Sequence, residues 1–252
     1  MKLTFESNLH FQQEAIKSIT DLFEGQPLED SITNSYLKEK QTSFVQGVSN
    51  NIIISEKQIL ANLKILQEKN EITVSNELNG MHFSVEMETG TGKTYVYLRT
   101  IYELNKLYGF KKFVIVVPSI AIREGVLKNL EITHDHFQTL YENVPVNFQV
   151  YESTKVSTLR GFATTNNIEI LILNIDSFAK DENIINKPND KLNGQKPVEY
   201  IQATNPIVIV DEPQNMETEK RVAAIENLKA LCTLRYSERT KIYIISLIAS
   251  IL

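Results

Sequence analysis

The sequence predicts an α/β domain built on a mainly parallel sheet. From Phe83 onward, short apolar runs alternate with segments of helical periodicity, and this alternation is typical of parallel strands joined by crossover helices. The chain has 252 residues, of which 42% are hydrophobic, and this is enough apolar material for at least one sizeable core. We therefore expect one large domain with a smaller appendage.

The first part of the chain precedes this pattern. Apolar side chains recur with helical spacing from Phe11 and stop at Gly25, a residue that favours the left-handed end of a helix. A second helical segment has apolar positions at i, i+4 and i+7 between Ile59 and Leu66. Residues 1–80 are accordingly predicted to be an N-terminal helical segment, with an insertion over 24–80.

The main domain is predicted to span residues 81–237. Its candidate strands are short apolar runs at 82–87, 112–117, 146–151, 168–174 and 206–210. Its candidate helices are 93–108, 120–130 and 216–231. The polar stretch 181–197 is predicted to be a long loop, and loops of that length are usually functional or disordered.

Charge and cysteine content exclude several classes of protein. The formal net charge of −5 does not predict a general polyanion-binding surface, so any nucleic-acid contact must be local. With Cys232 as the only cysteine, the chain can form neither an internal disulfide nor a cysteine-based metal site, and we expect a cytoplasmic protein. No segment approaches the roughly 20 apolar residues needed to span a bilayer.

A phosphate-binding loop is predicted between the strand 82–87 and the helix 93–108. It reads Glu88-Thr89-Gly90-Thr91-Gly92-Lys93-Thr94. Gly90 and Gly92 allow the backbone to bend so that successive N–H groups hold phosphate oxygens beside the positive end of the helix. We expect Lys93 to reach the β- and γ-phosphates and the Thr94 hydroxyl to coordinate Mg²⁺.

Two features of this loop bear on its interpretation. The general pattern has a glycine where this chain has Met87, so the motif by itself is incomplete. The alternative is a glycine- and threonine-rich turn with a solvated lysine.

Two carboxylates end the last predicted strand. Asp211 and Glu212 follow a fully apolar run, which places them at the carboxyl edge of a parallel sheet, where ligands of such sheets bind. We expect Asp211 to hold Mg²⁺ and Glu212 to orient and activate the attacking water. The alternative is a surface helix cap ahead of Pro213. The two motifs together, in this chain order, predict ATP and Mg²⁺ as cofactors.

These residues resemble a known family. The loop 88–94 resembles that of superfamily-two helicases, in which the first glycine of the general pattern is often absent. Asp211-Glu212-Pro213-Gln214 resembles the equivalent box of the restriction (Res) subunit of type III restriction-modification enzymes. The resemblance also includes 202–210 and 233–237 and runs from about Phe11 to Ser237, which would be the first quarter or so of a typical Res subunit. It implies a RecA-like P-loop motor domain.

The resemblance implies further roles. Gln12 matches the glutamine that reads the adenine edge, and Gln214 would sense the nucleotide state for a second motor domain. Val116–Ser119 and Asn174–Phe178 match segments that contact the nucleic-acid backbone. The alternative for Gln12 is a solvated helix glutamine. The alternatives for the two segments are an ordinary strand-to-helix turn at Val116–Ser119 and a plain strand end at Asn174–Phe178. The implied partners are double-stranded DNA and a modification (methyltransferase) subunit that recognises the site.

The resemblance stops after Ser237. Helicases of this kind continue Ser-Ala-Thr, whereas this chain continues Glu238-Arg239-Thr240 and then an apolar run over 242–252. We hypothesise that 238–252 is an atypical tail produced by an altered or ended reading frame, and a genuine final strand is the competing interpretation. Without a second motor domain and a nuclease, the chain is expected to bind Mg-ATP weakly, to hydrolyse it slowly if at all, and neither to unwind nor to cut DNA.

Two other functions are compatible with the sequence. One is a different superfamily-two motor that acts on DNA or RNA. The other is a non-catalytic remnant that binds nucleotide or a partner.

Overall fold

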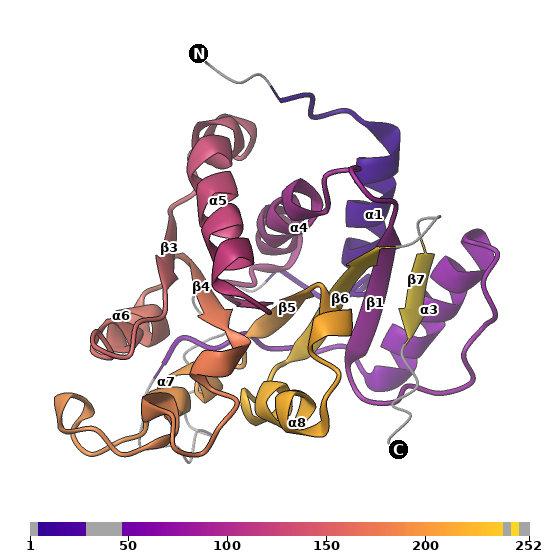
Figure 1. Ribbon diagram of the computed structural model, residues 1–252. Coiled ribbons are helices and arrows are strands. Elements are labelled where there is room, and N and C mark those ends of the chain that lie inside the picture. Colours follow the sequence, from indigo (N-terminus) through magenta and orange to yellow (C-terminus); the bar gives the residue numbers. More distant parts are fainter. Residues whose placement is uncertain (1–4, 29–46, 239–242, 247–252) are drawn as a thin grey trace.

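The computed structural model describes residues 5–28, 47–238 and 243–246 (Figure 1). The described strands form one seven-stranded sheet in the order β3-β4-β2-β5-β6-β1-β7. Neighbouring strands from β3 to β1 are parallel, and β7 alone pairs antiparallel, with β1. The predicted α/β class and the mainly parallel sheet are confirmed.

The strands are β1 (His82–Met87), β2 (Lys112–Val117), β3 (Val146–Val150), β4 (Ile168–Asn174), β5 (Ile207–Asp211), β6 (Cys232–Glu238) and β7 (Tyr243–Ser246). The α-helices are α1 (His10–Asp21), α3 (Glu56–Lys69), α4 (Lys93–Tyr108), α5 (Ile120–Leu140), α6 (Thr158–Thr164), α7 (Pro197–Gln202) and α8 (Glu219–Asn227). Short 3₁₀ turns are η2 (Ile175–Ser177), η3 (Ile184–Asn186), η4 (Asp190–Leu192) and η5 (Pro213–Asn215).

Helices cover both faces of the sheet. In Figure 1, α1, α4 and α5 lie on one face and α6, α7 and α8 on the other. Strand β2 shows why the sheet needs both layers. Phe113, Ile115 and Val117 pack into the first core, whereas Val114 and Val116 pack into the second. Since successive side chains of a strand point to opposite faces, a continuous apolar run requires cover on both sides.

The predicted N-terminal helices share the first core. Ala15 and Ile19 of α1 are fully buried in it, and Tyr108 Oη at the end of α4 donates a hydrogen bond to the Thr20 carbonyl at 2.8 Å. Asn62 Nδ2 of α3 donates to the Leu22 carbonyl at 3.0 Å. Part of the predicted insertion, residues 29–46, lies outside the described residues, and the division at residue 80 stays a prediction.

Several predicted elements have other bounds in the structure. Helix α5 continues ten residues past the predicted end, because Thr133 and Phe137 extend its buried face. Helix α8 is shorter than predicted and ends just before Lys229, whose φ of 51° is left-handed. The predicted loop 181–197 contains two 3₁₀ turns and leads directly into α7, whose first residue is Pro197. Proline suits the first helical position because it needs no N–H partner there.

Three elements of regular structure were not predicted: α6, α7 and β6. Strand β6 lies between β5 and β1. Strand β7 falls within the apolar run that the sequence leaves open between an altered tail and a genuine strand, and its backbone forms a strand. Residues 239–242 and 247–252 lie outside the described residues, so the altered reading frame stays a prediction.

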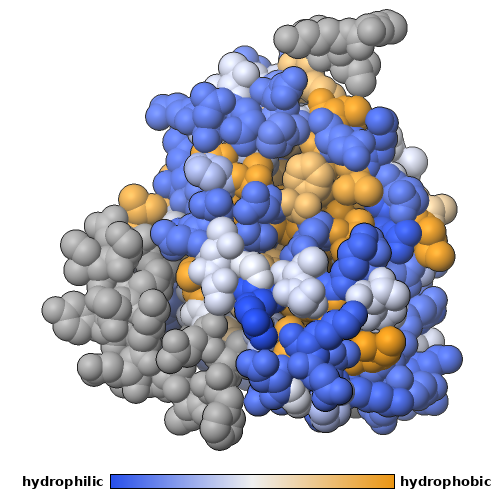
Figure 2. Space-filling model, turned by 90° about the vertical axis from the view of Figure 1, so that its left-hand side faces the viewer, coloured by the Kyte–Doolittle hydropathy of each residue, from blue (hydrophilic) through white to orange (hydrophobic). Residues whose placement is uncertain are grey.

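The side of the molecule at the β3 edge of the sheet is mainly hydrophilic, with apolar patches between the polar side chains (Figure 2). No helix in the described part of the chain is long and apolar enough to cross a bilayer.

Candidate functional site

The predicted phosphate loop and the predicted carboxylates lie at one edge of the sheet. The loop follows β1, and Asp211 is the last residue of β5. Only β6 separates these two strands, and all three are parallel. The carboxyl ends of parallel strands meet at the same edge, which is where open α/β sheets bind ligands.

The loop has the backbone of an anion cradle. Gly90 and Gly92 have φ angles of +79° and +84°, in the region that glycine adopts most readily. Thr91 closes the turn, since its N–H and hydroxyl both donate to the Glu88 carbonyl, at 3.3 and 2.6 Å. Helix α4 begins at Lys93 immediately after the left-handed Gly92, so its free N–H groups face the loop.

Gln12 of α1 supports the loop directly. Its side chain is buried, and Nε2 donates to the Thr91 carbonyl at 2.9 Å. A Cβ atom at Gly92 would lie 2.9 Å from the same nitrogen, so only glycine fits there without displacement. The structure thus brings Gln12 to the predicted site. Its role toward adenine stays a prediction.

Lys93 and Thr89 share one carboxylate. Glu238 is the last residue of β6, and the strand register places it beside Met87, the residue that precedes the loop. Lys93 Nζ lies 2.7 Å from Glu238 Oε1, and Thr89 Oγ1 donates to Oε2 at 3.1 Å. The Lys93 hydrogen bond and charge, together with the Thr89 hydroxyl, hold the pKa of Glu238 below its usual range. This contact was not predicted from the sequence.

Asp211 is a buried carboxylate with one side-chain donor. It is 6% exposed, and Tyr97 Oη of α4 donates to its Oδ2 at 3.2 Å. Burial raises the pKa of Asp211 to about 6; Tyr97 and Lys93 lower it and the neighbouring Glu212 raises it. A cation at this carboxylate would favour the ionised form.

Tyr97 is a site residue that sequence reasoning missed. It is fully buried, packs edge-on against Tyr236 of β6 at 5.5 Å between ring centroids, and interacts with both Thr94 and Asp211. It lies three residues after Thr94, one helical turn along α4. This spacing was the available signal, because residues at i and i+3 share a helix face.

Glu212 has a strained backbone. Its φ of 54° and ψ of 59° are left-handed, which is uncommon for a residue with a long side chain. Its N–H donates to the Tyr236 carbonyl at 3.2 Å, and its Oε2 accepts from Asn215 Nδ2 at 3.1 Å. Gln214 follows with an exposed side chain. The left-handed turn is where the chain leaves β5, so it determines where the Glu212 carboxylate lies.

The comparison with known families decides the relationship. A family model described as "Type III restriction enzyme, res subunit" matches residues 8–237. The chain belongs to this family. The predicted resemblance to the Res subunit is confirmed.

Three curated relatives are Res subunits of type III restriction-modification enzymes. The EcoPI Res subunit of Escherichia phage P1 is 29% identical over 92% of this chain and 26% of its own length. The EcoP15I Res subunit of Escherichia coli is 28% identical over 92% of this chain and 26% of its own. The StyLTI Res subunit of Salmonella typhimurium is 33% identical over 56% of this chain and 16% of its own. This Res chain spans about a quarter of the first two relatives.

Val116–Ser119 and Asn174–Phe178, the two segments expected to contact nucleic acid from the family resemblance, lie at the ends of β2 and β4. Ser119 caps α5, accepting from the Ile122 N–H at 3.3 Å. Asp176, after β4, pairs with Arg221 of α8 at 2.8 Å, and Arg221 also donates to the Asn215 carbonyl at 2.6 Å. Arg221 therefore connects the turn after Glu212 to the segment after β4. Contact with nucleic acid stays a prediction for both segments.

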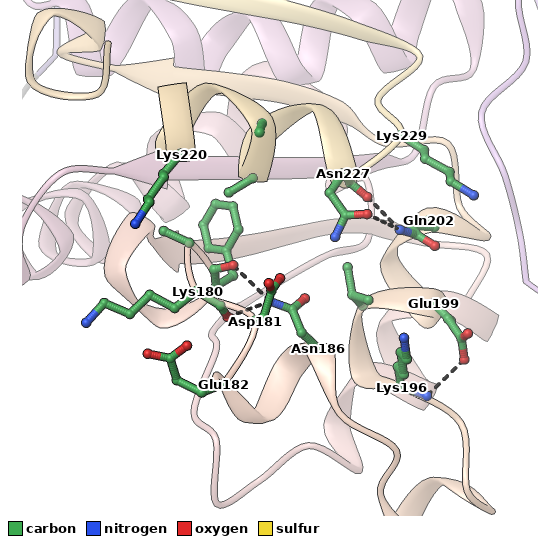
Figure 3. A pocket seen from close by; sticks show the side chains of 15 residues that line it. Lys180, Asp181, Glu182, Asn186, Lys196, Glu199, Gln202, Lys220, Asn227 and Lys229 are labelled. Atoms are coloured by element: carbon green, nitrogen blue, oxygen red, sulfur yellow. Dashed lines mark hydrogen bonds between the residues drawn. The ribbon is translucent and has the colours of Figure 1, made fainter. Parts of the chain in front are cut away.

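A cavity of about 1000 Å³ lies on the other helical layer, between α8 and the region of η3 and α7 (Figure 3). Its charged lining residues are Lys180, Lys196, Lys220, Lys229, Asp181, Glu182 and Glu199. Of the residues predicted for nucleotide, metal or nucleic-acid contact, Phe178 alone is among those that line it. Because both lysines and carboxylates line it, the cavity does not select a ligand of one charge.

Proposed function

We propose that this chain is the ATP- and Mg²⁺-binding first motor domain of a type III restriction enzyme. The observation that carries the proposal is that helix α4 links the phosphate loop to Asp211. Helix α4 begins at the phosphate loop, and its Tyr97 hydrogen-bonds to the buried Asp211 at the end of β5. A phosphate cradle and a metal-type carboxylate are therefore held together by one helix, in a chain that belongs to the Res family.

The residues present fit a magnesium nucleotide. The loop already holds an anionic group, because Lys93 and Thr89 bind the two oxygens of the Glu238 carboxylate. Gly90 and Gly92 keep the backbone N–H groups beside this position, at the start of a 16-residue helix. Asp211 is a single buried carboxylate whose raised pKa indicates that its charge lacks full compensation within the protein.

Each residue then has a defined task. Thr89, Thr91 and the loop glycines surround the phosphates, and Lys93 binds the β- and γ-phosphate oxygens. Thr94 and Asp211 would hold Mg²⁺, which neutralises charge on the phosphates when it is bound. Glu212, placed by its left-handed turn, orients and activates the attacking water. The exposed Gln214 is free to face a second motor domain.

The proposal extends to partners by family membership. The relatives are subunits of type III restriction-modification enzymes, so we propose double-stranded DNA and a modification subunit as partners, in the cytoplasm. Val116–Ser119 and Asn174–Phe178 would contact the DNA backbone, since they end the neighbouring strands β2 and β4 at the carboxyl edge of the sheet, the edge at which the phosphate loop also lies. We also propose the division into 1–80, 81–237 and a tail, 238–252.

Titration of the purified chain with Mg-ATP tests the proposal. Lys93→Ala should weaken binding by about 100-fold or more, because it removes the charged donor to two phosphates. Lys155→Ala is the matched control, since Lys155 also pairs with a glutamate, Glu152, at 3.0 Å, but lies beyond β3 at the far side of the sheet. Equal affinity of the Lys93 variant and the control would refute the phosphate-loop assignment.

A second experiment addresses chemistry. Glu212→Gln should keep Mg-ATP binding and suppress any hydrolysis, because Asp211 remains and only the water-activating carboxylate is neutralised. Measuring hydrolysis with duplex DNA and with RNA would separate the proposed function from that of another superfamily-two motor. Hydrolysis by the variant at the parental rate would remove Glu212 from this role.

A further inference from the structure

We propose that Glu238 is a built-in competitor for the phosphate site, occupying the donors that a nucleotide's terminal phosphates need. The inference rests on the proposed nucleotide-binding function and adds a regulatory contact to it. The geometry is specific, since both carboxylate oxygens are used: Oε1 lies 2.7 Å from Lys93 Nζ, and Oε2 accepts from the Thr89 hydroxyl at 3.1 Å.

The sheet places Glu238 at this position. Strand β6 pairs in parallel with β1, with Glu238 directly opposite Met87. Both strands point toward the carboxyl edge, so the side chain that ends β6 emerges beside the loop that follows β1. Met87 is the last residue of β1, and the phosphate loop begins immediately after it. The Glu238 carboxylate therefore lies close enough to contact Thr89 and Lys93 of that loop.

The contact and the nucleotide are mutually exclusive at Lys93. A lysine ammonium has three donors on one compact charge, and this one is only 12% exposed, so it has little room for a second anion. A carboxylate that stayed beside the loop would also repel the negative phosphates. Nucleotide binding therefore requires Glu238 to leave.

The structure also makes departure easy. The Glu238 side chain is 45% exposed and ends its strand, so it can turn toward solvent without opening the core. Because the carboxylate side of the ion pair is exposed to solvent, the pair contributes little net free energy, and the loop keeps its backbone donors. We therefore expect competition to weaken Mg-ATP binding by roughly two- to fivefold rather than to block it.

The test compares glutamate variants of the full chain by calorimetric titration with Mg-ATP and with inorganic tripolyphosphate. Glu238→Gln should bind both probes roughly two- to fivefold more tightly than the wild type, and Glu238→Ala should do the same. Glu152→Gln is the matched control. Its side chain is 48% exposed and pairs with Lys155 at 3.0 Å, but it follows β3, with four strands between it and β1. It should leave both affinities unchanged.

The outcomes separate this inference from the function on which it rests. Unchanged or weaker binding in both Glu238 variants, with Lys93→Ala still defective, would overturn the competition and leave nucleotide binding intact. Binding too weak to measure in the wild type, in Lys93→Ala and in both Glu238 variants would overturn the nucleotide-binding function and the competition with it.

A second measurement tests the ion pair between Lys93 and Glu238 in the absence of nucleotide. An amine-reactive acylating probe, followed by peptide mass spectrometry, should modify Lys93 slowly in the wild type, because its ammonium is paired and mostly covered. Glu238→Gln should raise the rate at Lys93 while leaving Lys155 unchanged. Equal Lys93 rates in the two proteins would show that the ion pair does not persist in solution and would overturn the proposal.

Discussion

The two edges of the sheet each hold a lysine, and the two lysines have opposite surroundings. Lys112 starts β2 at the amino edge; it is 0% exposed, and its Nζ donates to the Phe162 and Thr165 carbonyls at 2.6 and 2.5 Å. Lys93 starts α4 at the carboxyl edge, and its partner is the carboxylate of an exposed glutamate, Glu238. One charge is held by fixed main-chain oxygens, and the other by a side chain that can leave.

The other polar groups at the two edges differ in the same way. At the amino edge, Asn50 accepts from the Lys111 and Lys112 N–H groups and donates to the Lys112 carbonyl at 2.7 Å, so these polar groups satisfy one another's hydrogen bonds. At the carboxyl edge, Asp211 has a raised pKa and Glu212 a left-handed backbone. The difference indicates that polar groups at the amino edge hold the fold together, whereas those at the carboxyl edge are arranged for a ligand.

The largest expected effect is on the amino edge. Lys112→Met should lower the free energy of unfolding by about 3 kcal/mol, because it leaves two buried carbonyls without their charged donor. Lys111→Met is the matched control: this neighbour's ammonium donates a hydrogen bond to Asn166 at an exposed position, so we expect a change within about 0.5 kcal/mol. Urea denaturation of both variants measures the difference. Similar losses would show that Lys112 is no more structural than its neighbour.

The next effect is at the carboxyl edge and has the opposite sign. In EDTA at pH 7.5, Asp211→Asn should raise the free energy of unfolding by up to about 2.7 kcal/mol, since the pKa of Asp211 is raised from 3.8 to about 6 and each pKa unit corresponds to about 1.4 kcal/mol. Because the pKa of Asp211 is raised to about 6 in the fold, its stabilising contribution is present below pH 4 and is lost as the pH rises through 6.

Urea denaturation between pH 4 and 8 would test this linkage. The wild type should lose stability across that range relative to Asp211→Asn, which lacks the titrating group. Parallel profiles of the two proteins would show that Asp211 is not destabilised by burial. The Asn variant should also lose the response to Mg²⁺ during ATP titration, because an amide is a poor magnesium ligand.

Much of this architecture was predictable from local pattern. The bounds of β1, β2, β4 and α4 agree with the prediction to the residue, because each is an apolar run or a helical period. Helix α4, for example, lies between Gly92 and Gly109. Strand β6 was missed because polar residues interrupt it: Thr233, Arg235 and Ser237 alternate with apolar positions. Such alternation is typical of a half-buried strand and was the signal available.

The candidate site likewise has a part that was predictable from local sequence and a part that was not. Lys93, Thr94, Asp211 and Glu212 were predicted from motifs, because phosphate and metal chemistry requires those residue types next to strand ends. The Glu238 contact and the hydrogen bond from Tyr97 to Asp211 depend on the strand order β5-β6-β1, which no local pattern encodes. The hydrogen bond from Gln12 to Thr91 depends likewise on where α1 packs. The residues expected to bind phosphate and metal are therefore recognisable from local sequence, whereas the contacts that hold those residues in place depend on long-range packing.

The smallest expected effect separates backbone strain from packing inside the phosphate loop. Gly90 and Gly92 have similar φ angles, so alanine at either position pays a similar strain of about 1 kcal/mol. A Cβ at Gly90 meets nothing within 4 Å, whereas one at Gly92 would lie 2.9 Å from Gln12 Nε2. Gly92→Ala should therefore be less stable than Gly90→Ala by about 1 kcal/mol, the value of the displaced hydrogen bond to Thr91. Adding Gln12→Ala to each variant should abolish that difference in thermal unfolding. A difference that persisted in the double variants would mean that Gln12 does not brace the loop.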